Sequence, residues 1–161
     1  MTACTPIPSS YRGMPKTYTL CYEELYGHCY DSVSAAVVAL DLYSEGLELD
    51  ADHRMKGTGY NLYLSDVFVP DSLLVEGTYH SETTAAPYTF LPGHDYEGTP
   101  NGMYLLYVEQ DKLQSIQVLD SGSFIYRNDS LIFTLYYKNA YGSKATYKPT
   151  FHGTLLPWQK Q

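Results

Sequence analysis

The feature that most constrains the fold of this chain is the alternation of apolar and polar residues in short runs. In the run 130–138, every second side chain is apolar: Leu131, Phe133, Leu135 and Tyr137. In an extended strand, successive side chains point to opposite faces, so residues two apart share a face. The pattern therefore predicts β-strands that bury one face each.

Turn-forming residues separate these runs along the whole chain. Residues 34–41 suit either a helix or a strand, and the β-branched pair Val37-Val38 favours a strand. Pro149 has no N–H to donate, so the last strand lies at an edge or carries a bulge there. The candidate strands are 17–26, 35–43, 59–65, 73–80, 86–91, 102–109, 112–119, 122–127, 130–138 and 144–155.

These strands predict a single antiparallel all-β domain over residues 16–161. With about 8–10 strands, it is either a β-sandwich or a flattened meander barrel. Residues 1–15 contain three prolines and little apolar periodicity, so we expect a flexible N-terminal tether.

The charge balance limits the partners of the chain. It has 18 Asp and Glu against 10 Lys and Arg, a net charge of −8. Binding to nucleic acid or to anionic lipid needs clustered basic residues, and the sequence contains no such cluster. No apolar run reaches the length of a membrane-spanning helix. The sequence therefore predicts neither nucleic-acid binding nor membrane insertion.

The three cysteines each have two interpretations. Ala3-Cys4 matches the end of a bacterial lipoprotein signal, which predicts a lipid anchor at Cys4; otherwise Cys4 is a free thiol in a tail. Cys21 and Cys29 face each other in a disulfide if Gly27 turns a hairpin between them. Otherwise both are free thiols.

One motif has an enzymatic interpretation. Asp120-Ser121-Gly122-Ser123 follows an apolar run, as the catalytic Asp of aspartic proteases does. A chain with one copy would have to dimerise to supply the second carboxylate. The same residues are also ordinary turn formers between two strands. The five histidines lack metal-ligand spacing, and we predict no catalytic residue, cofactor or metal site.

Tyrosine accounts for 18 of the 161 residues. A phenol ring provides flat contact area with a polar tip, which suits sugar rings and protein partners alike. Many tyrosines in β-domains are instead packing residues. The candidate ligand face consists of Tyr63, Tyr96, Tyr104, Tyr136 and Trp158.

Several short motifs between residues 40 and 156 resemble those of uncharacterised secreted lipoproteins of gut Bacteroidetes. The resemblance implies an exported all-β domain, periplasmic or at the cell surface, often tethered by an N-terminal lipid. It also makes Asp31-Ser32-Val33, Asp71-Ser72-Leu73 and Asp129-Ser130-Leu131 candidate O-glycosylation sites. The motifs are 77–79, 89–93, 102–104, 120–124, 130–133 and 151–155.

Together these features favour a non-enzymatic β-domain of the cell envelope that binds a glycan or a surface protein through an aromatic face. One alternative is an accessory subunit of an adhesin or surface assembly, which accepts a partner strand at the edge strand 144–155. The enzymatic alternative is a dimeric aspartic protease that uses Asp120.

Overall fold

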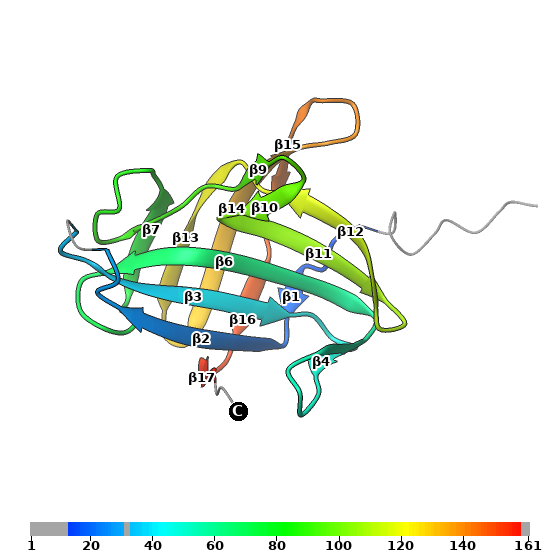
Figure 1. Cartoon of the computed structure of the whole chain (residues 1–161), viewed down its shortest axis with the longest axis horizontal. Coiled ribbons are helices and arrows are strands. Elements are labelled where there is room, and N and C mark those ends of the chain that lie inside the picture. The colour runs from blue at the N-terminus through cyan, green and yellow to red at the C-terminus, as the bar shows by residue number, and fades with distance from the viewer. Residues whose placement is uncertain (1–12, 31–32, 159–161) are drawn as a thin grey trace, which may run out of the picture.

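The computed structural model describes residues 13–30 and 33–158, and its regular structure is entirely β (Figure 1). The prediction of an all-β fold is confirmed for these residues, and positions 36–41 of the segment 34–41 form part of a strand. The strands are β1 (Thr17–Tyr18), β2 (Leu20–Gly27), β3 (Ala36–Tyr43), β4 (Leu47–Leu49), β5 (Met55–Gly57), β6 (Gly59–Val69), β7 (Gly77–Ser81), β8 (Thr89–Phe90), β9 (His94–Tyr96), β10 (Thr99–Asn101), β11 (Met103–Glu109), β12 (Lys112–Val118), β13 (Ser121–Arg127), β14 (Ser130–Lys138), β15 (Lys144–Tyr147), β16 (Thr150–His152) and β17 (Leu156–Pro157).

Most strands belong to one curled sheet, in which β6 occupies a central place. One edge of β6 pairs with β3, and the other pairs first with β11 and then with β8. Between these two partners β6 carries a β-bulge, because Ser65 and Asp66 stand opposite the single residue Ala39. A bulge bends its strand, and here it coincides with the change of neighbour.

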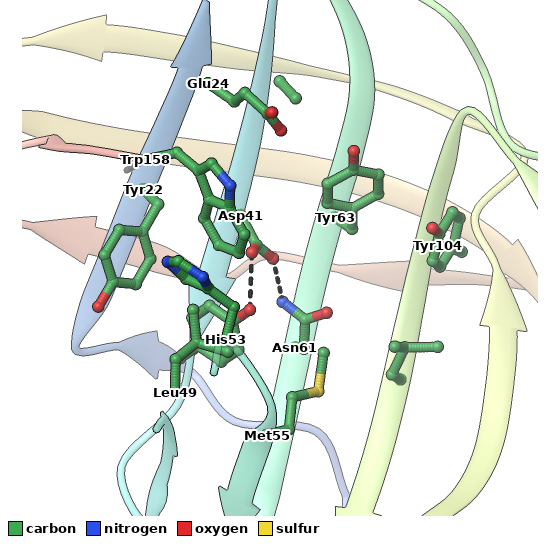
Figure 2. A pocket seen from close by; sticks show the side chains of 13 residues that line it. Tyr22, Glu24, Asp41, Leu49, His53, Met55, Asn61, Tyr63, Tyr104 and Trp158 are labelled. Carbon is green, nitrogen blue, oxygen red and sulfur yellow. Dashed lines mark hydrogen bonds between the residues drawn. The ribbon is translucent and has the colours of Figure 1, made fainter. Parts of the chain in front are cut away.

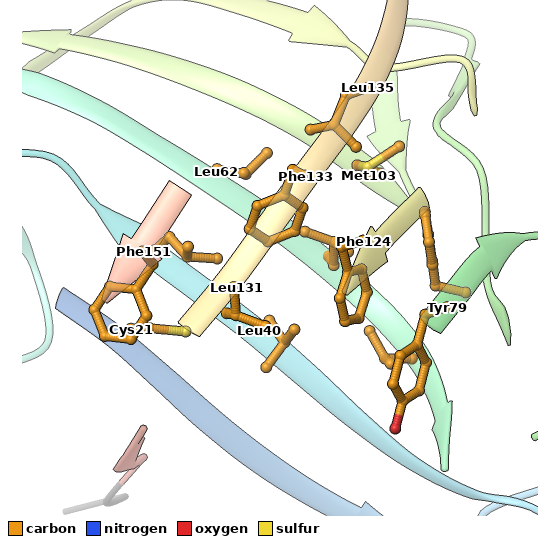
Figure 3. Packing of buried hydrophobic residues seen from close by; sticks show 14 of the residues in the cluster. Cys21, Leu40, Leu62, Tyr79, Met103, Phe124, Leu131, Phe133, Leu135 and Phe151 are labelled. Atoms are coloured by element: carbon orange, nitrogen blue, oxygen red, sulfur yellow. The ribbon is translucent and has the colours of Figure 1, made fainter. Parts of the chain in front are cut away.

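Figure 1 shows β2, β3, β6 and β11 crossing in front of β13, β14 and β16. The core lies between these two layers and is rich in aromatic rings. Phe124 of β13 stacks on Tyr79 of β7, with ring centroids 4.7 Å apart and ring planes 7° apart. Its ring centroid also lies 5.4 Å from that of Phe90. The Phe133 centroid lies 5.3 Å away on the neighbouring strand (Figure 3). Leu40 of β3 and Leu62 of β6 belong to the same core and come from the front layer.

The alternation of the sequence is visible in β14, where Leu131, Phe133 and Leu135 are buried. In β3, by contrast, every residue is buried. The face of β3 that points away from the core is therefore covered as well: Val37 packs with Ala35 and Phe68, and Tyr43 packs with Leu47 and Val108.

The strand boundaries differ from the predicted runs in several places. The run 17–26 divides at Thr19 into β1 and β2, the run 59–65 extends to Val69, and the run 86–91 is a strand only at Thr89–Phe90. Residues 144–155 divide at Pro149 into β15 and β16, as a residue without an N–H requires. The run 73–80 is a strand only from Gly77. Two hairpins, β4–β5 and β9–β10, lie in segments between the predicted strands.

The N-terminal segment is docked from residue 13 onward. Met14 packs against the core, and the Pro15 carbonyl accepts a 2.5 Å hydrogen bond from the Tyr147 hydroxyl. β1 then pairs in parallel with β16, and β2 pairs with β3. Within the predicted tether 1–15, residues 1–12 lie outside the described residues, and so does Cys4.

Cys21 and Cys29 are both free thiols. The hairpin that would bring them together does not form. Instead, β2 pairs with β3, which places Leu42 opposite Cys21. Cys21 is buried in the core, whereas Cys29 lies beyond the end of β2 and is exposed. Across the described residues, no helix has the length and apolar character needed to cross a membrane.

Candidate functional site

Four side chains form a row across the outer face of the front layer. The register pairs Tyr22 with Asp41, Asp41 with Tyr63, and Tyr63 with Tyr104, so the row crosses β2, β3, β6 and β11. Neighbouring strands lie about 4.8 Å apart, so the row spans roughly 14 Å. Since their sequence neighbours point into the core, these four side chains point away from it.

The row lines a pocket with a volume of about 260 Å³ (Figure 2). The β4–β5 hairpin covers one side of the pocket with Leu49, His53 and Met55, and the C-terminal segment adds Trp158. The remaining lining residues come from the four strands: Glu24, Ala39, Tyr43, Asn61 and Leu106. Segments far apart in the sequence thus converge on one hollow.

Local hydrogen bonds hold His53 in place. The side chain of Asp50 accepts hydrogen bonds from the backbone N–H groups of Asp52 and Arg54, at 2.8 and 2.9 Å. These bonds, the one from Arg54 foremost, lower the pKa of Asp50. They form an Asx turn that carries His53 at a φ of 59°. The His53 ring then lies 4.8 Å from the Trp158 ring, measured between centroids.

Backbone pairing fixes Trp158. β17 runs parallel to β2, with Pro157 opposite Glu23, and the N–H of Trp158 donates a 3.0 Å hydrogen bond to the Glu23 carbonyl. The indole therefore stands beside β2 and lines the pocket (Figure 2).

Asp41 is the buried carboxylate of the site, and only 9% of its surface is exposed. The Tyr43 hydroxyl donates to its Oδ2 at 2.6 Å, and the Asn61 amide donates to its Oδ1 at 2.5 Å. Burial raises the pKa of Asp41 to about 6, although both hydrogen bonds oppose the shift. The carboxyl group is therefore mainly ionised at neutral pH, and its orientation is fixed.

The aromatic rings meet largely edge to face. Tyr22 lies at 88° to Trp158 and at 80° to Tyr43, with centroids 5.7 and 5.9 Å apart. Tyr63 and Tyr104 form a second pair, 5.4 Å apart. Burial raises the pKa values of Tyr43 and Tyr63, so their hydroxyl groups stay protonated and act as neutral hydrogen-bonding groups. The rings form apolar walls of the pocket, and their hydroxyls provide hydrogen-bonding groups.

Three of the five residues predicted for a ligand face come together here, namely Tyr63, Tyr104 and Trp158. The other two lie elsewhere. Tyr96 is on the separate β9–β10 hairpin beside His94, with ring centroids 4.2 Å apart. Tyr136 is on β14 in the other layer, and Lys144 Nζ lies 4.2 Å from its ring centroid.

Sequence reasoning missed Tyr22, Asp41 and Asn61 as site residues. Asp41 did carry a signal, because a carboxylate interrupts the otherwise apolar stretch 35–42. A charged residue in a strand that is buried on both faces needs polar partners, and these come from β6 and from β3 itself. His53 had no such signal, since its position depends on the turn made by Asp50.

Asp120, the protease candidate, lies between β12 and β13 with its side chain exposed. Its backbone N–H donates a 2.8 Å hydrogen bond to the Tyr136 carbonyl, which joins the strand end to β14. Asp120 lines a different hollow, together with His94 and Tyr96. Among the described residues, no three His, Cys, Asp or Glu side chains gather closely enough to hold a metal ion.

Comparison of the chain with protein-family models, with curated proteins and with solved structures finds no match. Its function is therefore inferred from the geometry of the site.

Proposed function

We propose that this domain is a non-enzymatic binding module that takes a sugar unit of a glycan into the pocket around Asp41. The observation that carries the proposal is the meeting of Tyr22, Tyr63, Tyr104 and Trp158 around one buried, hydrogen-bonded carboxylate. Aromatic faces pack against the C–H surface of a sugar ring, and a fixed carboxylate accepts hydrogen bonds from its hydroxyls. The pocket volume of about 260 Å³ suits a single ring-sized unit.

The proposed module is a flattened barrel. The extended segment 17–27 supports this shape, because its first part pairs with β16 and its second part pairs with β3. One segment thus contacts both ends of the curled sheet. A closed sheet leaves fewer open edges and holds the four strands of the site in a fixed register.

The proposed setting is the bacterial cell envelope, with export and a lipid anchor at Cys4. This part rests on the sequence resemblance and on the Ala3-Cys4 pair. A binding module that is tethered by its N-terminus leaves the opposite part of the domain free to reach a glycan. Mass spectrometry of the protein purified from its native membrane fraction tests it, since acylation at Cys4 adds the mass of the lipid.

A role as an accessory subunit of a surface assembly is the second candidate function. Within the described part of the chain, β12 pairs with β11 alone, and Leu113 and Ile116 of β12 are exposed. In the strand region predicted for such docking, β15 pairs only with β14, whereas β16 is flanked by β14 and β1. An extended segment of a partner protein would add to the edge of β12. An Ile116→Lys variant would then lose that partner.

The dimeric aspartic protease is the third candidate, and it requires two Asp120 carboxylates at a two-fold interface. The exposure of Asp120 permits such contact. An Asp120→Asn variant that folds normally would lose all peptide hydrolysis. Equal activity in both proteins, or none in either, contradicts this candidate.

A glycan-array screen tests the binding function most broadly. The matched variants are Tyr63→Ala, inside the pocket, and Tyr136→Ala, on the other layer. We expect a saturable signal that Tyr63→Ala loses and Tyr136→Ala keeps, while both variants unfold cooperatively. A blank array, or a signal that both variants retain, contradicts binding in this pocket.

A further inference from the structure

The charged side chains that line the pocket indicate which class of sugar it binds. We infer that the ligand unit bound at Asp41 carries a protonated amine, so that the preferred glycan contains amino sugars with free amino groups. This inference rests on the proposed glycan-binding function and adds the chemical class of the ligand.

The lining side chains include two carboxylates, Asp41 and Glu24, and neither Lys nor Arg. His53 is the remaining titratable group apart from the tyrosines. The basic residues of the β4–β5 hairpin are Arg54, in its turn, and Lys56, whose Nζ lies 3.8 Å from Asp111 Oδ2 in an ion pair, and neither lines the pocket. The field in the pocket is therefore negative, which repels uronic acids and sulfated sugars and attracts a cation.

The Asp41 carboxylate has capacity left for a ligand. Tyr43 and Asn61 each donate one hydrogen bond, one to each oxygen. A carboxylate has about four lone-pair sites, so roughly two stay available. An ammonium group that donates to them forms a charge-assisted bond, which is about twice as strong as the bond from a neutral hydroxyl.

The aromatic walls favour the same ligand. Ring faces carry negative potential, and a cation within about 6 Å of a ring centroid is attracted to it. Tyr22 and Tyr63 flank Asp41 directly in the strand register, with Asp41 between them. Trp158 stands edge-on to Tyr22. An ammonium group that reaches Asp41 therefore lies among several rings as well as beside a carboxylate.

Glu24 adds a second negative charge on the neighbouring strand. The Tyr26 hydroxyl donates to its Oε2 at 2.8 Å. Burial is the main cause of the raised pKa of Asp41, and the negative charge of Glu24 acts in the same direction. Two carboxylates that repel each other gain from a cation placed near both. A neutral ligand leaves this repulsion in place.

Calorimetric titration at pH 7 compares four tetramers: glucosamine, N-acetylglucosamine, glucose and galacturonate. We expect glucosamine to bind on the order of tenfold more tightly than the two neutral tetramers, and galacturonate to bind most weakly. The preference for glucosamine should fall in Asp41→Asn and also in Glu24→Gln, a less buried change that provides a second test if the first variant misfolds. Glu82→Gln, a change at an exposed carboxylate outside the pocket, is the control and should keep the preference.

The outcomes separate the two proposals. Equal affinity for glucosamine and its N-acetylated form, or a preference that survives both carboxylate variants, overturns the amine inference and leaves glycan binding standing. The same holds if only neutral glycans bind. If no glycan binds at all, on the array or in solution, the proposed function itself fails.

Discussion

The hydroxyl group of Tyr43 donates a 2.6 Å hydrogen bond to Oδ2 of Asp41, two residues earlier on the same face of β3. Asn61 completes the arrangement from β6 and also donates to the Leu42 carbonyl at 2.9 Å. A strand that is buried on both faces thereby carries an ionisable group with one hydrogen-bond donor for each of its oxygens. The same group gives the pocket its charge.

The burial of Asp41 predicts a characteristic pH dependence of stability. Its pKa rises from 3.8 to about 6 on folding, so the folded state binds the proton more tightly than the unfolded state. This contribution to stability is complete below pH 3.8 and is lost as the pH rises through 6, by about 3 kcal/mol in total. Urea denaturation of the wild type and of Asp41→Asn between pH 3.5 and 8 measures it.

The Asp41→Asn variant lacks this titration, so its free energy of unfolding should fall less over that range. Other carboxylates, among them Glu23, whose pKa burial also raises, contribute to both proteins and cancel in the difference. A difference between the two proteins that is constant across the range, or that grows with the opposite sign, would contradict the burial of Asp41.

Neighbouring residues of β13 should differ sharply in their effect on stability. Phe124 is buried among three aromatic rings, whereas Ile125 points outward and is 37% exposed. We expect Phe124→Ala to lower the free energy of unfolding by about 3–5 kcal/mol and Ile125→Ala by about 1 kcal/mol or less. Urea midpoints of the two variants give the comparison, and similar losses would contradict the assignment of faces in β13.

Alanine substitutions at Gly102 and Gly142 distinguish the cost of backbone strain from the cost of a steric clash. Their φ angles are 76° and 77°, but a Cβ at Gly102 would lie 2.1 Å from the Pro92 carbonyl oxygen, whereas nothing lies within 4 Å at Gly142. We expect Gly142→Ala to cost about 1–2 kcal/mol through strain alone. Gly102→Ala should cost at least about 1 kcal/mol more, because backbone must move. Equal thermal-denaturation midpoints for the two variants would contradict the close approach of Gly102 to the Pro92 carbonyl.

Thiol labelling distinguishes the two cysteines of the described region. Cys29 is exposed, whereas Cys21 has no exposed surface and burial raises its pKa well above the usual value. A maleimide should therefore modify Cys29 in the native protein and Cys21 only after unfolding. Peptide mapping by mass spectrometry identifies each site. Protection of both thiols until a reductant is added would show that they are bridged instead.

The sequence predicts the strands of this fold well where the alternation is strict. In β14, one face packs on a dense core, so apolar residues recur at every second position. Alternation does not predict the hairpins β4–β5 and β9–β10, because they are short and mostly exposed. Their geometry depends on turn chemistry, such as the Asp50 side chain, rather than on burial.

The site was predictable only in part, for a similar reason. Tyrosine density identifies aromatic residues that suit a ligand face, and Tyr63, Tyr104 and Trp158 do meet. Which aromatics meet depends on strand order, and strand order is a long-range property that alternation does not encode. Tyr136 shares its residue type with Tyr63 but lies on the opposite layer. Trp158 reaches the pocket only because β17 pairs with β2.

The most direct test of ligand binding uses the fluorescence of Trp158, the single tryptophan of the chain, which lines the pocket itself. Titration of the wild-type protein with the glycans that score on the array should change its emission saturably. The Glu82→Gln protein should respond in the same way, and Tyr63→Ala should not. A glycan that binds by calorimetry and leaves the Trp158 emission unchanged would show that the ligand site lies elsewhere on the domain.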